Sequence, residues 1–174
     1  MGVAWSKLNP RAWSSVMAGP LIHLDELGCL DLMRDFAEVQ VPEVVCQEVQ
    51  RNRPSALRRR SVKLTRMRFS PQPTRELLEL SQVFLLNAGE LEALKLMQEN
   101  PAGILLTDDA AARFDAHRLQ YEVHGTIGVV LRALRRQQRT KRQILNLLRS
   151  LPQRSTLFIE ARFLNSVIEQ VKNS

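Results

Sequence analysis

Apolar residues along the chain follow two different spacings, and each spacing predicts one type of secondary structure. Five of them at near-helical intervals predict an amphipathic helix over Leu21–Phe36. The run Gly103–Thr107 is instead short and continuously apolar, which is the pattern of a strand covered on both faces of a parallel sheet. Strands that alternate with helices indicate βαβ units, so the sequence predicts an α/β fold with right-handed crossovers.

The same patterns predict the remaining elements. Thr74 and Asn87 have the residue types that cap helix N-termini, and Arg51–Ser61 is interpreted as a loop or a loose helix end. Short strands are expected over Glu38–Val41, between Val62 and Phe69, and over Tyr121–His124. Helices are expected over Pro42–Gln50, Ala88–Asn100, Ala110–Leu119, from Thr126 to about Gln138, over Lys141–Ser150 and over Phe158–Val171.

Length and composition favour a globular cytoplasmic protein. A chain of 174 residues with 44% hydrophobic residues can bury one core. It has no apolar run of the roughly 20 residues that a membrane span needs, and its first 20 residues lack the apolar segment of a secretory signal. The two cysteines, Cys29 and Cys46, have no metal-like spacing and are expected to be reduced thiols.

Charge adds an expectation about the partner. The formal net charge is +7, which favours an anionic partner and, first of all, nucleic acid. Two runs, Arg51–Arg68 and Arg132–Arg149, contain basic residues and no acid. Either run alone is compatible with a solvated surface, but together they favour phosphate binding. The arginines predicted to contact the phosphates of a nucleic acid are Arg51, Arg53, Arg58, Arg59, Arg60, Arg132, Arg135 and Arg136.

Several acids have positions that suit chemistry as well as structure. Asp108 and Asp109 follow the buried strand, so they are expected at the carboxyl edge of the sheet, where open α/β sheets bind ligands. Glu90 stands three residues after Asn87, as in a capping box. Glu48 lies within a predicted helix, where a solvated surface role is the simpler interpretation. Asp115 shares a helix face with Asp108 and is expected at the surface.

Other kinds of active site have no support. His23, His117 and His124 lack the spacing of a zinc site. No serine lies in a nucleophile-elbow motif, and no glycine-rich phosphate loop is present. Clustered carboxylates that hold a hard divalent cation against a phosphodiester are therefore the favoured chemistry.

The ordered blocks of the chain resemble the PIN-domain family, and within it the VapC-toxin-like proteins. The opening block, Pro20–Leu24, is followed by Val41–Val49, which carries a carboxylate near its end. Ala88–Leu94 is similar to the third block of the family. Leu105–Asp109 with Gly125–Val130 is similar to the fourth. Each block alone is weak, but the set in this order is fairly specific and extends from about residue 16 to residue 150.

The resemblance implies a three-layer α/β/α fold with a central, mostly parallel sheet and extra C-terminal helices. It places Glu48, Glu90 and Asp109 at metal-site positions for Mg²⁺ or Mn²⁺, and Asp108 beside them as a fourth catalytic residue. The family has an acid or asparagine at the end of its first strand, where this chain has Met17, whose thioether is a poor ligand for a hard cation. The preceding residues, 11–16, do not have the pattern of a buried strand.

The expected domain organisation is an N-terminal extension over residues 1–15, a PIN-like domain over 16–140, and a helical segment over 141–174 that packs on the same domain. Three functions remain open. The first is a divalent-metal-dependent endoribonuclease of toxin–antitoxin type, with RNA as substrate. The second is a degraded PIN-like module that binds RNA or a protein without cleaving. The third is a DNA-binding or antitoxin-like regulator, for which no helix-turn-helix is apparent. The family also implies an antitoxin partner and a homodimer.

Overall fold

The central feature of the molecule is a parallel sheet. The computed structural model describes residues 13–58, 62–68 and 71–174. Within these residues the sheet has five strands in the order β3-β2-β1-β4-β5, and every neighbouring pair is parallel. The strands are β1 (Trp13–Val16), β2 (Glu38–Pro42), β3 (Leu64–Met67), β4 (Ile104–Leu106) and β5 (Glu122–His124).

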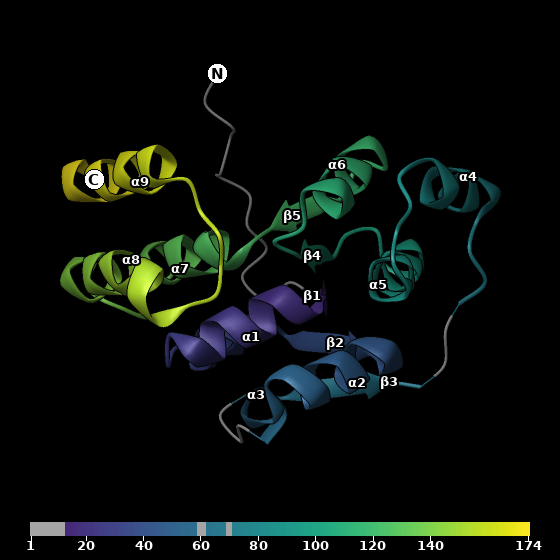
Figure 1. The fold of residues 1–174 in the computed structure, drawn as a ribbon, viewed down its shortest axis with the longest axis horizontal. Helices are drawn as coiled ribbons and strands as arrows, with labels where there is room; N and C mark the ends of the chain where they lie inside the picture. Colours follow the sequence, from purple (N-terminus) through teal and green to yellow (C-terminus); the bar gives the residue numbers. More distant parts are fainter. Residues whose placement is uncertain (1–12, 59–61, 69–70) are drawn as a thin grey trace.

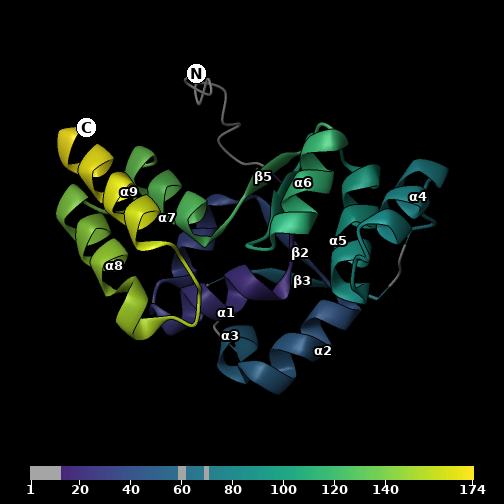
Figure 2. The same cartoon turned by 45° about the horizontal axis from the view of Figure 1, so that its top comes forward.

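Helices cover both faces of this sheet, as Figures 1 and 2 show, with α4, α5 and α6 gathered on one side and α7, α8 and α9 on the other. The predicted caps are confirmed: the Thr74 side chain caps α4, and Asn87 and Glu90 form a capping box at α5. The helices are α1 (Ala18–Glu26), the 3₁₀ helix η2 (Leu30–Asp35), α2 (Glu43–Asn52), α3 (Pro54–Arg58), α4 (Arg75–Val83), α5 (Ala88–Glu99), α6 (Ala110–Arg118), α7 (Thr126–Arg135), α8 (Lys141–Arg154) and α9 (Ala161–Asn173).

Strand β4 shows why the fold has three layers. Its three residues are buried, and they divide between two apolar clusters according to the period of two of a strand. Ile104 and Leu106 belong to the cluster that includes residues of α1, α7 and α8, whereas Leu105 belongs to the cluster with α5 and α6. The sheet therefore separates two cores, which confirms the predicted three-layer α/β/α architecture.

Strand β1 corrects one expectation. Residues 13–16 were not expected to form a buried strand, yet they form the middle strand of the sheet, and residues 13–15 fall inside the segment assigned to an extension. Ser14 and Ser15 are fully buried, and their hydroxyls donate to the carbonyl oxygens of Glu38 and Ala93 at 3.2 and 3.1 Å. Neighbours on both sides and these two acceptors satisfy the polar groups, so apolar side chains are not required here.

The helix expected over Leu21–Phe36 is also corrected, because α1 ends at Glu26 and the chain continues as η2. Gly28 has a φ of 71°, in the left-handed region where glycine is favoured. Its N–H donates to the Asp25 carbonyl, and the Cys29 N–H donates to the Leu24 carbonyl, which is the hydrogen-bond pattern of a Schellman motif. The apolar spacing continues across the break because both pieces pack on the same core.

Candidate metal centre

A hollow of about 430 Å³ lies at the carboxyl edge of the sheet. Strands β1 and β4 end there side by side, since the Met17 N–H donates to the Leu106 carbonyl at 3.0 Å. Helices α1, α5 and α6 all begin at this edge, so their N-terminal ends place a partial positive charge near it. The side chains that line the hollow include the three predicted metal-site acids, Glu48, Glu90 and Asp109.

Each of these acids comes from a different helix, which is why local sequence could not establish their proximity. Glu48, on α2, brings Oε2 to 3.6 Å from where a Cβ would stand at Gly89 in the first turn of α5. Glu90 is the third residue of α5, and Asp109 is the N-cap of α6, where one carboxylate oxygen accepts from the Ala112 N–H at 2.8 Å. The structure thus brings the three predicted acids to one hollow.

The proximity of the acids also affects the electrostatics of the hollow. Burial raises the pKa of Glu90 above its ordinary value, and a hydrogen bond from the Asn87 N–H lowers it in part. The negative charges of Asp109, Glu48 and Asp115 raise the pKa of Glu90 further. Like charges at one site repel unless a cation or a proton neutralises them, so this cluster suits a positively charged ligand.

The acids differ in how many oxygens remain available. Both carboxylate oxygens of Glu90 accept from Asn87, one from the backbone N–H at 2.9 Å and one from the side-chain amide at 2.7 Å. Asp109 uses Oδ1 for the cap of α6. Glu48 has no hydrogen-bond or ion-pair partner within residues 13–58, 62–68 and 71–174. The uncommitted oxygens at the hollow are therefore those of Glu48 and Oδ2 of Asp109.

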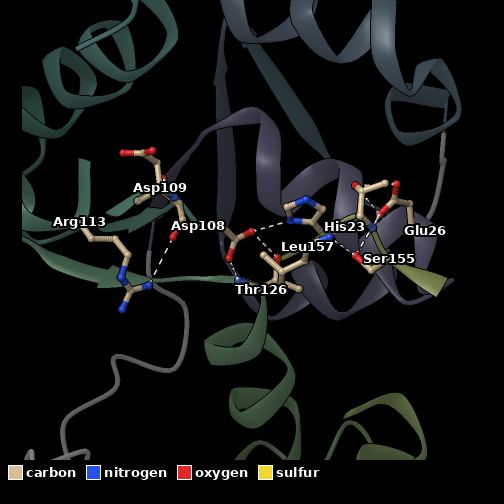
Figure 3. Close-up of polar contacts among 10 residues, drawn as sticks. His23, Glu26, Asp108, Asp109, Arg113, Thr126, Ser155 and Leu157 are labelled. Carbon is tan, nitrogen blue, oxygen red and sulfur yellow. Dashed lines mark hydrogen bonds and ion pairs between the residues drawn. The ribbon is translucent and has the colours of Figure 1, made fainter. Parts of the chain in front are cut away.

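Asp108 has a different environment from Asp109, although the two are adjacent in sequence. Its carboxylate accepts from the Thr126 N–H at 2.7 Å, from the Thr126 hydroxyl at 2.6 Å, and from His23 Nδ1 at 2.8 Å. Figure 3 shows Asp108 between His23 and Thr126, with the Asp109 carboxylate directed away from both. Asp108 therefore ties the end of β4 to α1 and α7. It also lines the hollow, and its predicted catalytic role stays a prediction.

Asp115 lies in the buried face of α6, so the expectation of a surface position is wrong. Its exposed fraction is 0%, and neither carboxylate oxygen has a hydrogen-bond partner among the described residues. Burial raises the pKa of Asp115, and the positive charge of Arg118 lowers it in part. A carboxyl group in such a place is held in its neutral form more readily than an exposed one.

Donor chemistry at the hollow fits a hard divalent cation with few protein ligands. Two uncommitted carboxylates with water completing the shell is a common arrangement for Mg²⁺. No group of three histidine, cysteine, aspartate or glutamate side chains is arranged to enclose an ion within the described part of the chain. Met17 also lines the hollow, and its thioether adds no ligand for Mg²⁺. The residues present therefore fit an open site that relies on Glu48 and Asp109 and would leave the remaining ligand positions to solvent.

The first arginine run is only partly available to a phosphate. Arg51 and Arg58 are exposed on α2 and α3. Arg53 instead donates to Asp25 at 2.7 Å, and the side chain of Asp25 is fully buried. Two of the predicted contacts in this run, Arg59 and Arg60, lie outside the described residues.

The second run contains the clearest departure from a predicted RNA contact. Arg132 is 1% exposed, donates to Asp35 at 2.6 Å, and lies with its guanidinium 5.0 Å from the centre of the Phe36 ring. This corrects the prediction for Arg132, because a guanidinium buried against an acid and a ring does not face solvent. Arg136 also pairs with Asp35, at 2.9 Å, while Arg135 is exposed.

Some residues at the hollow were not singled out by the sequence. His23 was considered as a zinc ligand and as part of a family block, and Thr126 only as part of a family block, yet both hold Asp108. Leu157 and Phe158, far along the chain, line the same hollow. A histidine one turn into a helix and a polar residue at the start of another give no spacing signal, since their meeting depends on how β4, α1 and α7 pack.

Comparison with known proteins agrees with this architecture. A family model described as a PIN domain matches residues 16–173, which is most of the chain. No curated protein matches the chain. Within the described residues, no helix is long and apolar enough to cross a membrane. From the extent of the family match, the chain belongs to the PIN-domain family.

Proposed function

We propose that this protein is a divalent-metal-dependent endoribonuclease of the VapC toxin type, with Mg²⁺ or Mn²⁺ bound at the hollow. The observation that carries the proposal is that Glu48, Glu90 and Asp109, from three helices, line one hollow at the carboxyl edge of the sheet. The negative charges of Asp109 and Glu48 help to raise the pKa of Glu90, and a bound cation would offset that repulsion. Membership in a nuclease-like family supports the same chemistry.

When bound, the cation would supply an activated water and neutralise charge on the scissile phosphate. Glu48 and Asp109 would hold it through their uncommitted oxygens. Glu90 stays in its capping box and fixes the N-terminus of α5 beside them. Ala18 and Gly19, at the start of α1, also line the hollow, and the N-cap Met17 provides no side-chain hydrogen bond to that helix. The N–H groups of this first turn therefore offer donors to a phosphate oxygen.

Cleavage of a mixed RNA pool with Mg²⁺ or Mn²⁺ tests the proposal. We expect wild-type protein to cleave, and Glu48→Gln and Asp109→Asn to lose cleavage while their unfolding midpoints stay close to that of wild type. Glu79→Gln is the matched control, because Glu79 is an exposed acid on α4 whose partner is Arg75. Equal cleavage by wild type and both hollow variants, or none by any of them, would rule out catalysis at this hollow.

Met17→Asp tests the open nature of the site. Met17 is 6% exposed and lies at the end of β1 on the wall of the hollow, so an aspartate there adds a carboxylate beside Glu48 and Asp109. We expect Mn²⁺ affinity, measured by calorimetry, to increase at least about tenfold, as for the gain of one good ligand contact. Unchanged affinity would mean that position 17 does not face the cation.

Met17 also favours the second candidate, a PIN-like module that binds RNA or a protein without cleaving. Since only two acids have uncommitted oxygens, metal affinity can fall below what catalysis needs. RNA binding without cleavage in either metal, weakened by a double substitution of the exposed Arg51 and Arg58 to serine, would support this candidate. A flatter salt dependence of binding in that variant would identify the lost contacts as phosphate contacts.

The VapC-type assignment includes further expectations, which are an antitoxin partner, a homodimer and a cytoplasmic location. Buried cysteines agree with the last, since Cys29 and Cys46 are both free thiols. Light scattering of the purified protein tests the dimer.

Expression of wild type and Asp109→Asn from an inducible promoter tests toxicity, and growth arrest by wild type alone is the expected result.

A further inference from the structure

The connection between α8 and α9 is fixed against the C-terminal end of α1, just before the residues that line the hollow. Glu26, at the end of α1, accepts from the Thr156 N–H at 2.7 Å, from the Thr156 hydroxyl at 3.0 Å and from the Ser155 hydroxyl at 3.0 Å. Burial acts to raise the pKa of Glu26, but these hydrogen bonds and the charge of His23 outweigh it, and the pKa is lowered. Figure 3 shows Ser155 beside Glu26, and Leu157 close to His23 and Thr126.

After this anchor the connection alternates between inward and outward side chains. Leu157 and Ile159 are half-buried and pack on the main core. Phe158, between them, is 94% exposed, although it lines the hollow together with the acids. Two flanking apolar contacts and the Glu26 anchor hold the backbone on both sides of Phe158. The ring is therefore presented to solvent by a fixed segment.

Phe158 is the one phenylalanine, tyrosine or tryptophan among the described residues at the hollow. A single exposed apolar residue usually needs no explanation. Phe158 is different because it lies beside carboxylates that suit a cation and, through it, a phosphate group. A nucleotide whose phosphate lay in the hollow would carry its base close to the ring of Phe158. Every base has a flat face that can stack on an aromatic ring, provided that the base is not already paired.

We propose that Phe158 is a stacking platform for an unpaired base of the RNA bound at the hollow. The inference rests on the proposed RNA function and deepens it. Leu157 and Ile159 position the ring, and Phe158 itself contacts the base. Stacking on an aromatic side chain contributes about 1–3 kcal/mol per base, which corresponds to a change of roughly 5- to 150-fold in affinity.

Fluorescence anisotropy of the full chain with a labelled 12-nucleotide RNA tests this, with Ca²⁺ in place of Mg²⁺ or Mn²⁺ so that a cation still neutralises the acids at the hollow while cleavage is suppressed. We expect wild type to prefer the single strand over the same sequence in a duplex. Phe158→Ala should lower affinity for the single strand about 5- to 150-fold and leave the weaker duplex affinity unchanged. Phe158→Trp should retain the single-strand affinity of wild type, because it keeps an aromatic ring at this position. Phe163→Ala is the matched control, since Phe163 is a 55% exposed phenylalanine on α9 that does not line the hollow.

Different results would overturn different parts of the proposal. If wild type binds the single strand and Phe158→Ala binds it equally well, the stacking role is refuted while the proposed function stands. If wild type binds neither RNA, the proposed function is refuted as well. If Phe158→Ala changes the oligomeric state in size-exclusion chromatography, the ring belongs to an interface between copies of the chain, which also overturns the stacking role.

Discussion

Substitutions of the adjacent residues Asp108 and Asp109 at the end of β4 should have different effects, with Asp108 affecting mainly stability and Asp109 affecting mainly cleavage. Asp108→Ala removes the acceptor of three hydrogen bonds, of which two come from Thr126, a fully buried residue. His23, the third donor, is 14% exposed and can turn to water. A buried donor that loses its partner costs about 1–3 kcal/mol. Two such donors therefore predict a loss of about 2–6 kcal/mol in the free energy of unfolding, and about 3 kcal/mol is a moderate value in that range.

Asp109→Ala removes the same atoms one residue later and should cost much less. Its carboxylate caps α6 with one hydrogen bond, and loss of an N-cap costs about 1 kcal/mol. Asp109→Asn keeps a capping side chain, so its stability should stay within about 0.5 kcal/mol of wild type. In the proposed function Asp109→Asn nevertheless loses cleavage, because the amide removes a negative oxygen from the hollow.

Urea unfolding followed by circular dichroism measures these differences, provided that the dependence on urea concentration has the same slope in each variant. For a chain of this size, a loss of 3 kcal/mol lowers the melting temperature by about 6–12 °C. If Asp109→Ala is destabilised as much as Asp108→Ala, Asp108 is not the residue that ties β4 to α1 and α7. The structural assignment of Asp108 would then be refuted.

Three further predictions concern pH and packing. Burial lowers the pKa of His124 to about 4. The neutral imidazole therefore contributes to stability above the unfolded pKa of 6.5, and this contribution is lost as the pH falls towards 4. Between pH 7 and pH 4.5 the free energy of unfolding should fall by up to about 3 kcal/mol, and His124→Gln should reduce that fall. The pKa of Asp115 is raised, so its effect on stability runs the other way, and stability is lost as the pH rises above the ordinary value of 3.8. Asp115→Asn should therefore stabilise the protein more at pH 7.5 than at pH 4. An equal effect at both pH values would contradict this prediction. Gly125→Ala would put a Cβ 2.6 Å from Asp108 Oδ1, which is too close for an ordinary contact. The melting temperature of this variant should therefore fall by several degrees. An unchanged melting temperature would mean that the backbone at position 125 can move away from Asp108.

Element types followed from the sequence because period and caps are local properties. The buried run that became β4 and the capping box of α5 have their determinants within a few residues. Strand β1 could not be predicted in this way, because it is stabilised by strand neighbours on both sides and by two carbonyl acceptors that lie far along the chain. Short polar strands in the middle of a sheet carry no apolar signal of their own.

Charge runs misled for a related reason. Arg53 and Arg132 each lie in a run without acids, yet each pairs with an aspartate from the segment after β1, Asp25 and Asp35 respectively. Net charge along a stretch says how the unfolded chain is charged, and the folded surface depends on pairs made between distant segments. The three acids at the hollow could be proposed together only through a family resemblance, since no local spacing connects α2, α5 and α6.

The central position of β1 has a consequence for how the chain folds. Its partners are residues 38–40 on one side and 104–106 on the other, so the middle of the sheet cannot be completed before the fourth strand has been synthesised. Non-local pairing of this kind slows folding and leaves strand edges open for longer. A ribosome-bound chain that ends before residue 104 would therefore hold an unfinished sheet edge, and we expect it to need chaperone protection that the complete chain does not.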